Sequence, residues 1–461
     1  NLCRLEGDED PYQWSNKRKW LLSITFSIQN VAASMGASIF TPGITLIARD
    51  FGQSNVIVTL GLSFYVLGMA FGPIIFAPMS EVYGRKVVQA PAWILFIAFQ
   101  FGCVFSQNIE TLVICRFFVG VFASPALTVA GGVLMDIWEP DKSGPPMGLF
   151  TMAAFLGPVI GPIVGGFLVQ GLALDEGWRW CFGVQLILSG VFLLNWLWIP
   201  ETLQKTLILR KAQRQHKESG ASGVVASKPD MAIFKKAVWR PLEMLFLDPI
   251  ILLSSLYISF IFGILYLFFA AYPIVFQGRY HMKPGPSGLA FLGIGLGVLI
   301  SFPTAGVASK VYIKMKAARG LDRFPEGRLP FSIIGSILVP VSLFWFAWSG
   351  FQRIHWIVPV LSGIPFGWSM TTIFINFISF IAEGYLEYAA SAIAANTIMR
   401  SVFSAAFPLF SAQMYTKLKP EWASTLLGCI SILFIPVPYL FWKYGPMLRE
   451  RSRFNPGTGS A

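Results

Sequence analysis

The sequence from residue 72 to residue 86 reads Gly-Pro-Ile-Ile-Phe-Ala-Pro-Met-Ser-Glu-Val-Tyr-Gly-Arg-Lys and ends in a short polar segment. This segment separates two long apolar runs, from Val56 to Met79 and from Val87 to Phe105. Each run is long enough to cross a bilayer as a helix, which takes about 20 apolar residues. We therefore expect a tight turn at a membrane surface, and we interpret its carboxylate and two cations as a latch.

The composition indicates an integral membrane protein. Of the 461 residues, 55% are hydrophobic and 13% are charged, which is too apolar for a soluble protein of this length. Twelve apolar runs lie between Trp20 and Trp442. Residues 80–85 are echoed by Ser-Lys-Val-Tyr-Ile-Lys at 309–314, after the second run of each half. Chance can produce so short an echo, but a duplicated six-span unit requires this position. We expect an all-α membrane protein with twelve transmembrane helices in two pseudo-symmetric six-helix bundles.

The charge distribution predicts the orientation. A net charge of +12 could indicate nucleic-acid binding, but most of the 35 lysines and arginines fall in segments on one side of the predicted membrane. This positive-inside bias predicts cytoplasmic termini and no nucleic-acid partner. The expected parts are a cytoplasmic N-terminal tail, an N-terminal bundle, a cytoplasmic linker, a C-terminal bundle and a cytoplasmic C-terminal tail, at residues 1–19, 20–199, 200–248, 249–443 and 444–461.

Two arginines lie inside apolar runs. Arg116 is in the fourth run, and Arg400 is near the middle of the eleventh. A guanidinium at such a depth is costly unless it meets water, a polar partner or a ligand. Arg116 could instead snorkel to the outer surface, although the small residues at 120, 123 and 124 leave room beside it. Both arginines are predicted to line a wet central cavity.

Four other residues are candidates for the wall of this cavity. Asn30 lies in the first run, where a polar side chain either bonds to a neighbouring helix or faces water. Tyr266 has a hydroxyl that needs a partner. Trp368 and Asn376 follow Gly363, Pro365 and Gly367, a break typical of a gating helix.

The opening stretch and the fifth run supply candidate conformational elements. Glu81, Gly84 and Arg85 form the latch, and Asp136 is a candidate partner for Arg85, although ordinary surface charge is an equal alternative. Such a pair would form only when the helices close on the inner side, and would favour one state. Glycines and prolines of the fifth run are expected to bend that helix and pack it against the opposite half: Gly157, Pro158, Gly161, Pro162, Gly165 and Gly166.

These motifs together resemble those of a known family. The stretch at 72–86 resembles the loop motif of the major facilitator superfamily, Arg116 matches its arginine in span 4, and residues 157–166 are similar to its antiporter motif. With Pro200-Glu201-Thr202, Tyr266-Leu267-Phe268-Phe269 and the run from Ser391 to Arg400, the chain resembles fungal twelve-span drug:proton antiporters.

The resemblance implies a central cavity, alternating access and export of small amphipathic molecules against proton entry. It also implies that Glu81 lies near the N-terminus of span 11, where its charge complements the helix dipole, and that Arg85 points toward Asp136. These contacts would hold the outward-facing state.

One departure puts proton coupling in doubt. Where such transporters often have a glutamate in span 7, this chain has Ala270, and no Asp or Glu lies deep in a span. Coupling could use Asp136 or Glu81, position 270 could carry a substitution, or the protein could be an uncoupled carrier. In the last case the arginines would suit an organic anion, such as an acidic secondary metabolite. Neutral amphipathic substrates remain open, as do cations, including polyamines.

Other classes fit the sequence less well. No Gly-x-x-x-x-Gly-Lys-Ser/Thr loop is present for an ATP-driven pump, and no constellation suits an enzyme, a metal or a cofactor. A sensor that binds ligand without moving it is another possibility. We expect a monomer surrounded by membrane lipids, in the plasma membrane or alternatively the vacuolar membrane.

Overall fold

The computed structural model describes residues 7–139, 142–172, 177–219, 231–321 and 323–450, together with Ser452 and Phe454. Every regular element in these ranges is a helix. Ten segments among them are long and apolar enough to cross a membrane, and the last, Ala389–Glu450, covers two predicted spans. The expected all-α membrane class is therefore confirmed.

One group of helices forms the N-terminal bundle. Polar residues cap several of their N-termini, because a side-chain oxygen there accepts a bond from an otherwise unpaired backbone N–H; Ser15, Ser54 and Asn108 are examples. The group comprises α1 (Asn16–Met35), α2 (Ile44–Asp50), α3 (Asn55–Tyr83), α4 (Arg85–Val104), α5 (Ile109–Ala123), α6 (Pro125–Ile137), α7 (Gly144–Gly171) and α8 (Gly177–Trp198).

The linker and the C-terminal bundle follow. The linker contains α9 (Gln204–Ser219) and α10 (Met231–Leu247). Asp248 then caps the next helix through Ile250 N and Ile251 N. The C-terminal bundle comprises α11 (Pro249–Tyr272), α12 (Pro284–Leu289), α13 (Leu292–Arg319), α14 (Pro330–Ser349), α15 (Ile357–Leu361), α16 (Gly363–Tyr385), α17 (Ala389–Phe434) and α18 (Pro436–Glu450). A turn at Lys419, with φ of 63°, divides α17 into two spans.

Two helix breaks differ from expectation. The first apolar run is interrupted after α1 by turns at residues 36–40, before α2 completes it. In the tenth run the break lies at Ser362, between α15 and α16, and not within residues 363–367. Pro365 falls in the first turn of α16, where its missing N–H has no helical partner to lose, so that helix continues unbroken.

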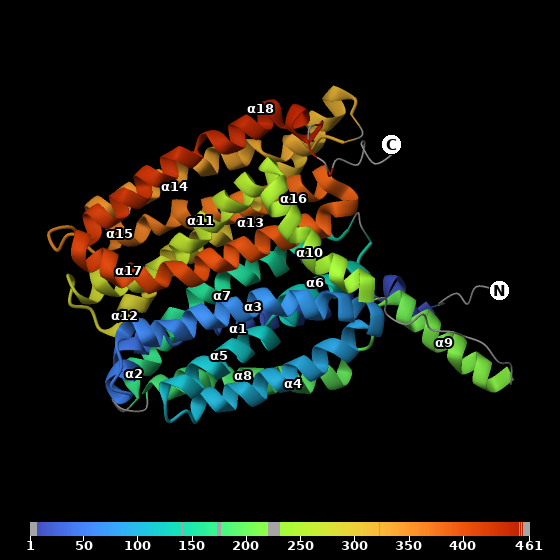
Figure 1. Cartoon of the computed structure of the whole chain (residues 1–461), viewed down its shortest axis with the longest axis horizontal. Helices are drawn as coiled ribbons and strands as arrows, with labels where there is room; N and C mark the ends of the chain where they lie inside the picture. Colours follow the sequence, from blue (N-terminus) through green and yellow to red (C-terminus); the bar gives the residue numbers. More distant parts are fainter. Residues whose placement is uncertain are drawn as a thin grey trace.

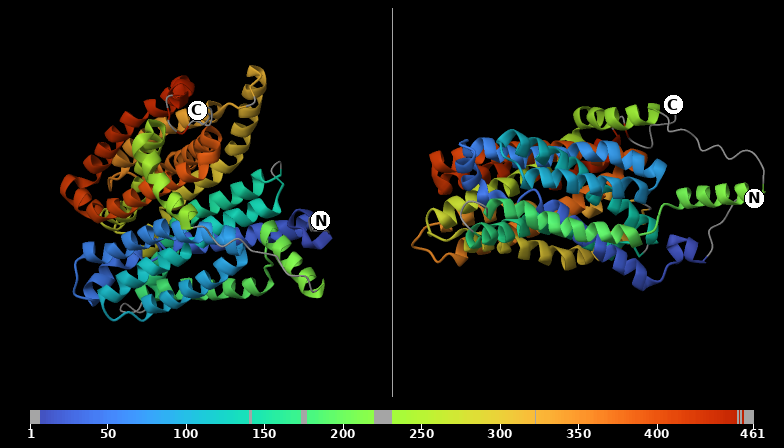
Figure 2. Two further views of the ribbon diagram at one scale, coloured as in Figure 1. Left: turned by 45° about the vertical axis from the view of Figure 1, so that its right-hand side comes forward. Right: turned by 90° about the horizontal axis from the view of Figure 1, so that it is seen from below.

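The two bundles lie side by side, the N-terminal one lower and the C-terminal one upper in Figure 1. We call the end that carries α9, the start of α1 and the end of α18 the linker end, and the opposite end, with α2, α12 and α15, the far end. The bundles converge toward the far end and diverge toward the linker end (Figure 2, left).

The hydrogen bonds that join the two bundles in the described chain lie away from the linker end. The Ser63 hydroxyl on α3 donates to Ala405 O on α17 at 2.6 Å. Gly285 N donates to the Gln170 side chain at 3.0 Å, which joins α12 to α7. A Cβ on Gly166 would lie only 2.5 Å from Pro284 O, so the backbones approach closely there. These contacts close the far end.

Candidate functional site

A cavity of about 240 Å³ lies between the two bundles. Its lining comes from α1, α3, α6 and α7 on one side and from α11, α16 and α17 on the other. Of the predicted wall residues, Asn30, Tyr266 and Arg400 line it. We call it the central cavity. Because both bundles contribute to its wall, any movement between them changes its shape.

Arg400 is the only charged residue among the described residues that line the central cavity. Its guanidinium carbon lies 4.7 Å from the centre of the Phe262 ring and 5.2 Å from that of Phe374. No residue of the described ranges accepts a hydrogen bond from Arg400 or forms an ion pair with it. Its five N–H donors are therefore left to water or to a bound molecule.

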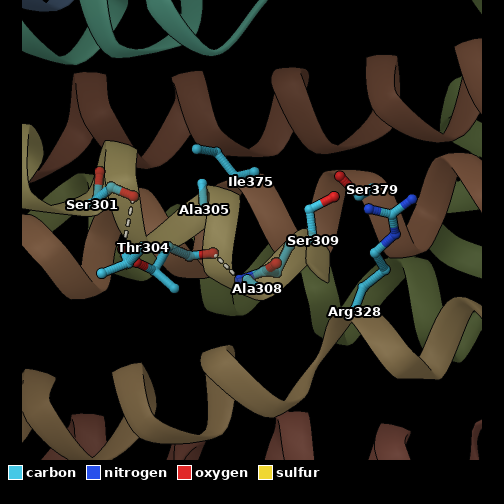
Figure 3. A pocket seen from close by; sticks show the side chains of 10 residues that line it. Ser301, Thr304, Ala305, Ala308, Ser309, Arg328, Ile375 and Ser379 are labelled. Atoms are coloured by element: carbon cyan, nitrogen blue, oxygen red, sulfur yellow. Dashed lines mark hydrogen bonds between the residues drawn. The ribbon is translucent and has the colours of Figure 1, made fainter. Parts of the chain in front are cut away.

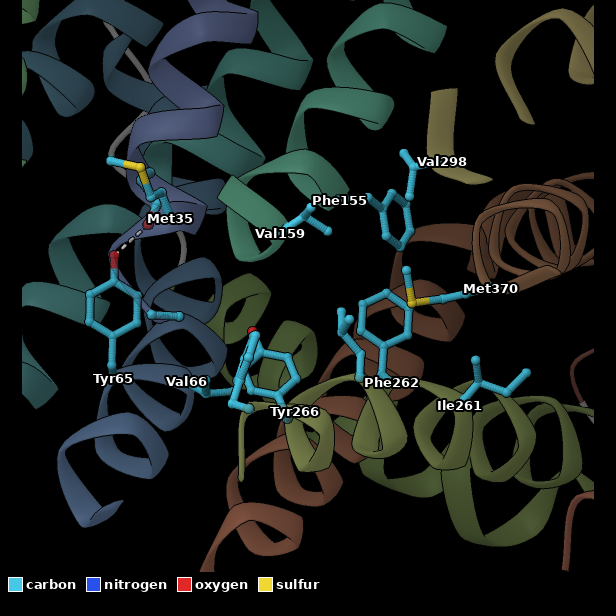
Figure 4. Packing of buried hydrophobic residues seen from close by; sticks show 14 of the residues in the cluster. Met35, Tyr65, Val66, Phe155, Val159, Ile261, Phe262, Tyr266, Val298 and Met370 are labelled. Carbon is cyan, nitrogen blue, oxygen red and sulfur yellow. Dashed lines mark hydrogen bonds between the residues drawn. The ribbon is translucent and has the colours of Figure 1, made fainter. Parts of the chain in front are cut away.

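Three phenylalanines bring the bundles together beside Arg400. Phe155 of α7 lies 5.4 Å from Phe262 of α11 and 5.2 Å from Phe374 of α16, measured between ring centres, and all three line the cavity. We call them the three-ring cluster. Figure 4 shows Phe155 and Phe262 meeting between the bundles, with Tyr266 nearby. The cluster gives the cavity an aromatic wall.

Polar groups complete the wall. On α17, Thr397, Arg400, Ser401 and Ser404 recur at three- and four-residue spacing and so share one helix face. The Asn30 amide donates to Phe150 O at 3.1 Å, while its oxygen has no partner within the described residues. One side of the cavity wall is therefore aromatic and apolar, and the other side carries hydroxyl groups and the Arg400 cation.

The predicted position of Arg116 in the cavity wall is wrong. Its side chain is fully buried inside the N-terminal bundle and donates to Gly61 O at 3.1 Å, Gly36 O at 2.7 Å and Ala37 O at 3.1 Å. It also packs over the Tyr65 ring at 4.3 Å. The chain turns at residues 36–40, so the carbonyls of 36 and 37 lack helical N–H partners. Arg116 donates hydrogen bonds to those carbonyls and so satisfies the backbone groups that the break in the first span leaves unpaired.

Trp368 and Asn376 also lie outside the central cavity, contrary to expectation. Trp368 Nε1 donates to the Thr304 hydroxyl at 3.1 Å, and Asn376 Nδ2 donates to Thr372 O at 2.8 Å. Asn376 lines a pocket of about 50 Å³ between α13 and α16, with Thr304 and Arg328 (Figure 3). These side chains point into the C-terminal bundle because α16 presents its other face, with Phe374, to the N-terminal bundle.

The linker end of the N-terminal bundle holds a charge cluster. Arg85 Nε lies 2.9 Å from Asp136 Oδ2, and Arg85 Nη1 donates to the Ser80 hydroxyl at 2.8 Å. The buried carboxylate of Glu201 accepts from the backbone N–H of Arg85 at 2.8 Å and of Lys86 at 3.2 Å. Gly84 makes the turn with φ of 107°, and a side chain there would collide with Glu201.

This geometry corrects the expected behaviour of the latch. Arg85 starts α4 and Asp136 lies in the last turn of α6, so both belong to one bundle and pair while the bundles diverge at the linker end. The pair therefore does not require closure between bundles. Glu81 is exposed and has no partner within the described residues. Its placement at the N-terminus of span 11 is not seen in this conformation and stays a prediction for the other state.

The glycine series of α7 serves mainly its own bundle, not the opposite half. A Cβ on Gly157, Gly161 or Gly165 would collide with α1 or with the turn after it. Only Gly166 of the four glycines meets the opposite bundle, at α12. Pro158 lines the central cavity, and Pro162 O lies close to Gly288 of α12. Because these glycines have no side chain, the backbones of α1 and α7 can pack in direct contact.

Acidic groups are missing from the described wall of the central cavity. Ala270 is half-buried on α11 and does not line it. Within the described ranges, no group of three or more His, Cys, Asp or Glu side chains is placed to hold a metal ion. The charge of the described cavity wall is therefore set by Arg400.

Several residues with clear structural roles were not predicted as site residues. Glu201 was recognised only as part of the Pro-Glu-Thr segment after the sixth run, and that motif was the signal for it. Phe155 and Phe374 carried no signal, since each lies among many other aromatic residues. Their roles depend on which helix face meets the other bundle.

Comparison with known proteins gives consistent results. A family model described as Major Facilitator Superfamily matches residues 26–408. The chain is 40% identical over 460 residues to the "Major facilitator superfamily multidrug transporter mdrA" of Aspergillus fumigatus, which covers 98% of this chain and 75% of that protein. It is 38% identical over 465 residues to the "Citrinin biosynthesis cluster MFS transporter mrr1" of Monascus ruber, covering 99% and 92%.

Solved structures resemble the chain in fold. A crystal structure of a D-xylose-proton symporter matches with a TM-score of 0.66 at 16% identity, covering 93% of this chain and 98% of that one. The xylose transporter XylE of E. coli, in a partially occluded inward-open conformation, matches with a TM-score of 0.63 at 16% identity, covering 92% and 99%.

Proposed function

This chain belongs to the major facilitator superfamily, and we propose that it exports small amphipathic organic molecules by alternating access. It is a multi-pass integral membrane transporter. Relatives named as a multidrug transporter and as a biosynthesis-cluster transporter support export of organic molecules. A carrier of this kind binds its substrate between two bundles and exposes it to each side in turn.

One observation carries the proposal: the central cavity has walls from both bundles, and the described hydrogen bonds that join the bundles lie toward the far end. The Ser63–Ala405 and Gly285–Gln170 hydrogen bonds join the bundles toward the far end. At the linker end the bundles diverge, and Glu81 is exposed without a partner in the described chain. We assign the linker end to the cytoplasm because of the positive-inside bias, so this conformation faces inward.

A reversible lock at the far end tests alternating access. We expect Ser63→Cys with Ala405→Cys, in a background without the native cysteines, to form a disulfide that stops flux of 1-naphthamide or 1-naphthoate in proteoliposomes. A reductant should restore the flux, and Ser63→Cys alone should be unaffected by oxidation. Undiminished flux through the oxidised pair would contradict the proposal. Binding of these solutes without any flux would favour a sensor.

Proton antiport is part of the proposal, with Asp136 or Glu81 as the candidate groups. A second candidate is uncoupled transport, which is favoured by the lack of a carboxylate in the described wall of the central cavity. Vesicles with a pH gradient imposed or collapsed distinguish the two. Antiport requires that collapsing the gradient abolishes uphill flux, whereas an uncoupled carrier only equilibrates its substrate.

The cellular setting completes the proposal. We place the protein in the plasma membrane, with the vacuolar membrane as the alternative, as a monomer with both termini in the cytoplasm. Fluorescence microscopy of a tagged chain tests the membrane, and protease access to tags at each terminus tests the orientation. Protection of either terminus in sealed inside-out vesicles, whose cytoplasmic face is outward, would overturn the assignment.

A further inference from the structure

We propose that the central cavity is a binding site for small aromatic anions, in which Arg400 binds a carboxylate and the three-ring cluster binds the aromatic body. This inference rests on the proposed transport function and names the substrate class. Four observations carry it: the unpaired guanidinium, the charge of the wall, the aromatic cluster and the size of the cavity.

The guanidinium of Arg400 lacks a protein acceptor. It lies over the faces of Phe262 and Phe374, at 4.7 and 5.2 Å, and no described residue accepts a hydrogen bond from it. Ring faces stabilise a cation but accept none of its N–H bonds in the way that an oxygen does. An arginine also stays protonated, so the free-energy cost of a charge without hydrogen-bond acceptors is not removed by deprotonation. A carboxylate fits the open position because it accepts two parallel bonds from a guanidinium.

The charge of the described wall disfavours organic cations as substrates. Arg400 is the only charged group among the described lining residues, so an organic cation would meet repulsion without a compensating carboxylate. Charges interact more strongly in such apolar surroundings than in water. The Ser401 hydroxyl, next to Arg400 and also in the wall, has no partner in the described chain and can donate to the same anion.

The cavity also selects an aromatic body of limited size. Phe155, Phe262 and Phe374 lie 5.2 to 5.5 Å apart between ring centres and offer both faces and edges to another ring. A volume of about 240 Å³ is below the roughly 300–1,000 Å³ of drug-sized pockets. One or two fused rings with a single carboxylate match this space.

Anion transport also removes the need for a proton-binding group in the cavity. In a cell with a negative interior, an anion that leaves moves down the membrane potential. For the uncoupled candidate, the potential alone can then drive export, in keeping with a cavity wall that has no described carboxylate.

A series of three probes that differ only in charge, which we call the charge ladder, tests the inference. The probes are 1-naphthoate, 1-naphthamide and 1-naphthylmethylammonium, which share one aromatic body and differ in charge. Their binding to the purified full chain is measured by titration calorimetry. We expect naphthoate to bind about tenfold more tightly than naphthamide, in keeping with one charge-assisted bidentate pair, and the ammonium to bind most weakly.

Variants locate the preference. Arg400→Gln should weaken naphthoate binding about tenfold and leave naphthamide binding unchanged, and Arg400→Lys should fall between them because an ammonium lacks the planar fork. Lys310→Gln, which removes an exposed cation outside the cavity, is the matched control and should change nothing. Equal binding of the three probes by the wild type, or equal loss of naphthoate and naphthamide in Arg400→Gln, overturns the inference. The wild-type ladder decides the matter even if a variant does not fold.

Flux separates this inference from the transport proposal. In proteoliposomes with valinomycin and no pH gradient, a tenfold potassium gradient should distribute naphthoate at least about tenfold at equilibrium, about tenfold for an uncoupled carrier and more for a proton antiporter, and leave naphthamide less unevenly distributed than naphthoate. Flux of both probes without a preference for charge would overturn the anion site and leave transport intact. Selective binding of naphthoate through Arg400 without any flux would overturn transport and leave the anion site intact.

Discussion

Arg116 and Arg400 both lie inside apolar helices, yet their surroundings are opposite. Arg116 is fully buried and donates to three backbone carbonyls at 2.7 to 3.1 Å. Arg400 lines the central cavity, lies over two ring faces and has no hydrogen-bond acceptor in the described chain. A buried cation with acceptors supports the fold, whereas one without acceptors is available to a ligand. The presence of an arginine inside an apolar helix therefore does not by itself assign a function.

The largest expected effect is on stability at Arg116. We expect Arg116→Met to lower the free energy of unfolding by on the order of 3 kcal/mol, because it leaves the carbonyls of Gly36 and Ala37 buried without donors. Thermal unfolding in detergent measures the loss. Arg400→Met is the matched control and should not lower the unfolding temperature. Equal losses in the two variants would break the contrast between the arginines.

The same contrast predicts a difference between two glutamates at the linker end. Glu201 is buried and accepts four backbone N–H bonds, from Arg85, Lys86, Thr202 and Leu203. Glu201→Ala should cost about 2 kcal/mol of stability, since those donors lose a charged acceptor. Glu81→Ala should leave the unfolding temperature unchanged, because Glu81 is exposed and unpaired in the described chain. A larger loss at Glu81 would show that it already has a structural partner.

A smaller effect is expected where Arg400 meets the rings. Phe262→Leu and Phe374→Leu each remove one ring face from the guanidinium and from a bound aromatic solute. Each change should weaken binding of 1-naphthoate by about 1 kcal/mol, as measured by titration calorimetry. Phe71→Leu, an exposed ring outside the cavity, is the control and should bind like the wild type. Identical affinities in all three variants would remove the ring cluster from the site.

The smallest effect should come from Asn376. Its amide bonds to Thr372 O in the small pocket of the C-terminal bundle, away from the central cavity. Asn376→Ala should leave transport of the naphthalene solutes unchanged and cost about 0.5 kcal/mol of stability. Asn30→Ala, which alters the central cavity, is the comparison variant and should change transport. Loss of transport in Asn376→Ala would show that this residue contributes to substrate binding or transport after all.

Individual side chains show how far prediction from sequence reached. Arg400 and Tyr266 could be placed at the cavity because polar groups deep in a span need water or a partner, and both line it. The same argument failed for Arg116, because its partners are carbonyls freed by a helix break at residues 36–40 that the apolar pattern does not show. Asn376 failed for another reason, since the face that α16 turns toward the other bundle is set by packing.

The sequence by itself determined the membrane class and the family, because hydrophobic length and a few local motifs are read along the chain without knowledge of contacts. Only the tertiary structure decided which arginine was satisfied, which bundle the glycines of α7 served and that Arg85 pairs with Asp136 inside one bundle. The physical reason is that the cost of a buried charge depends on acceptors brought from distant parts of the chain. Those acceptors become neighbours only when the helices pack.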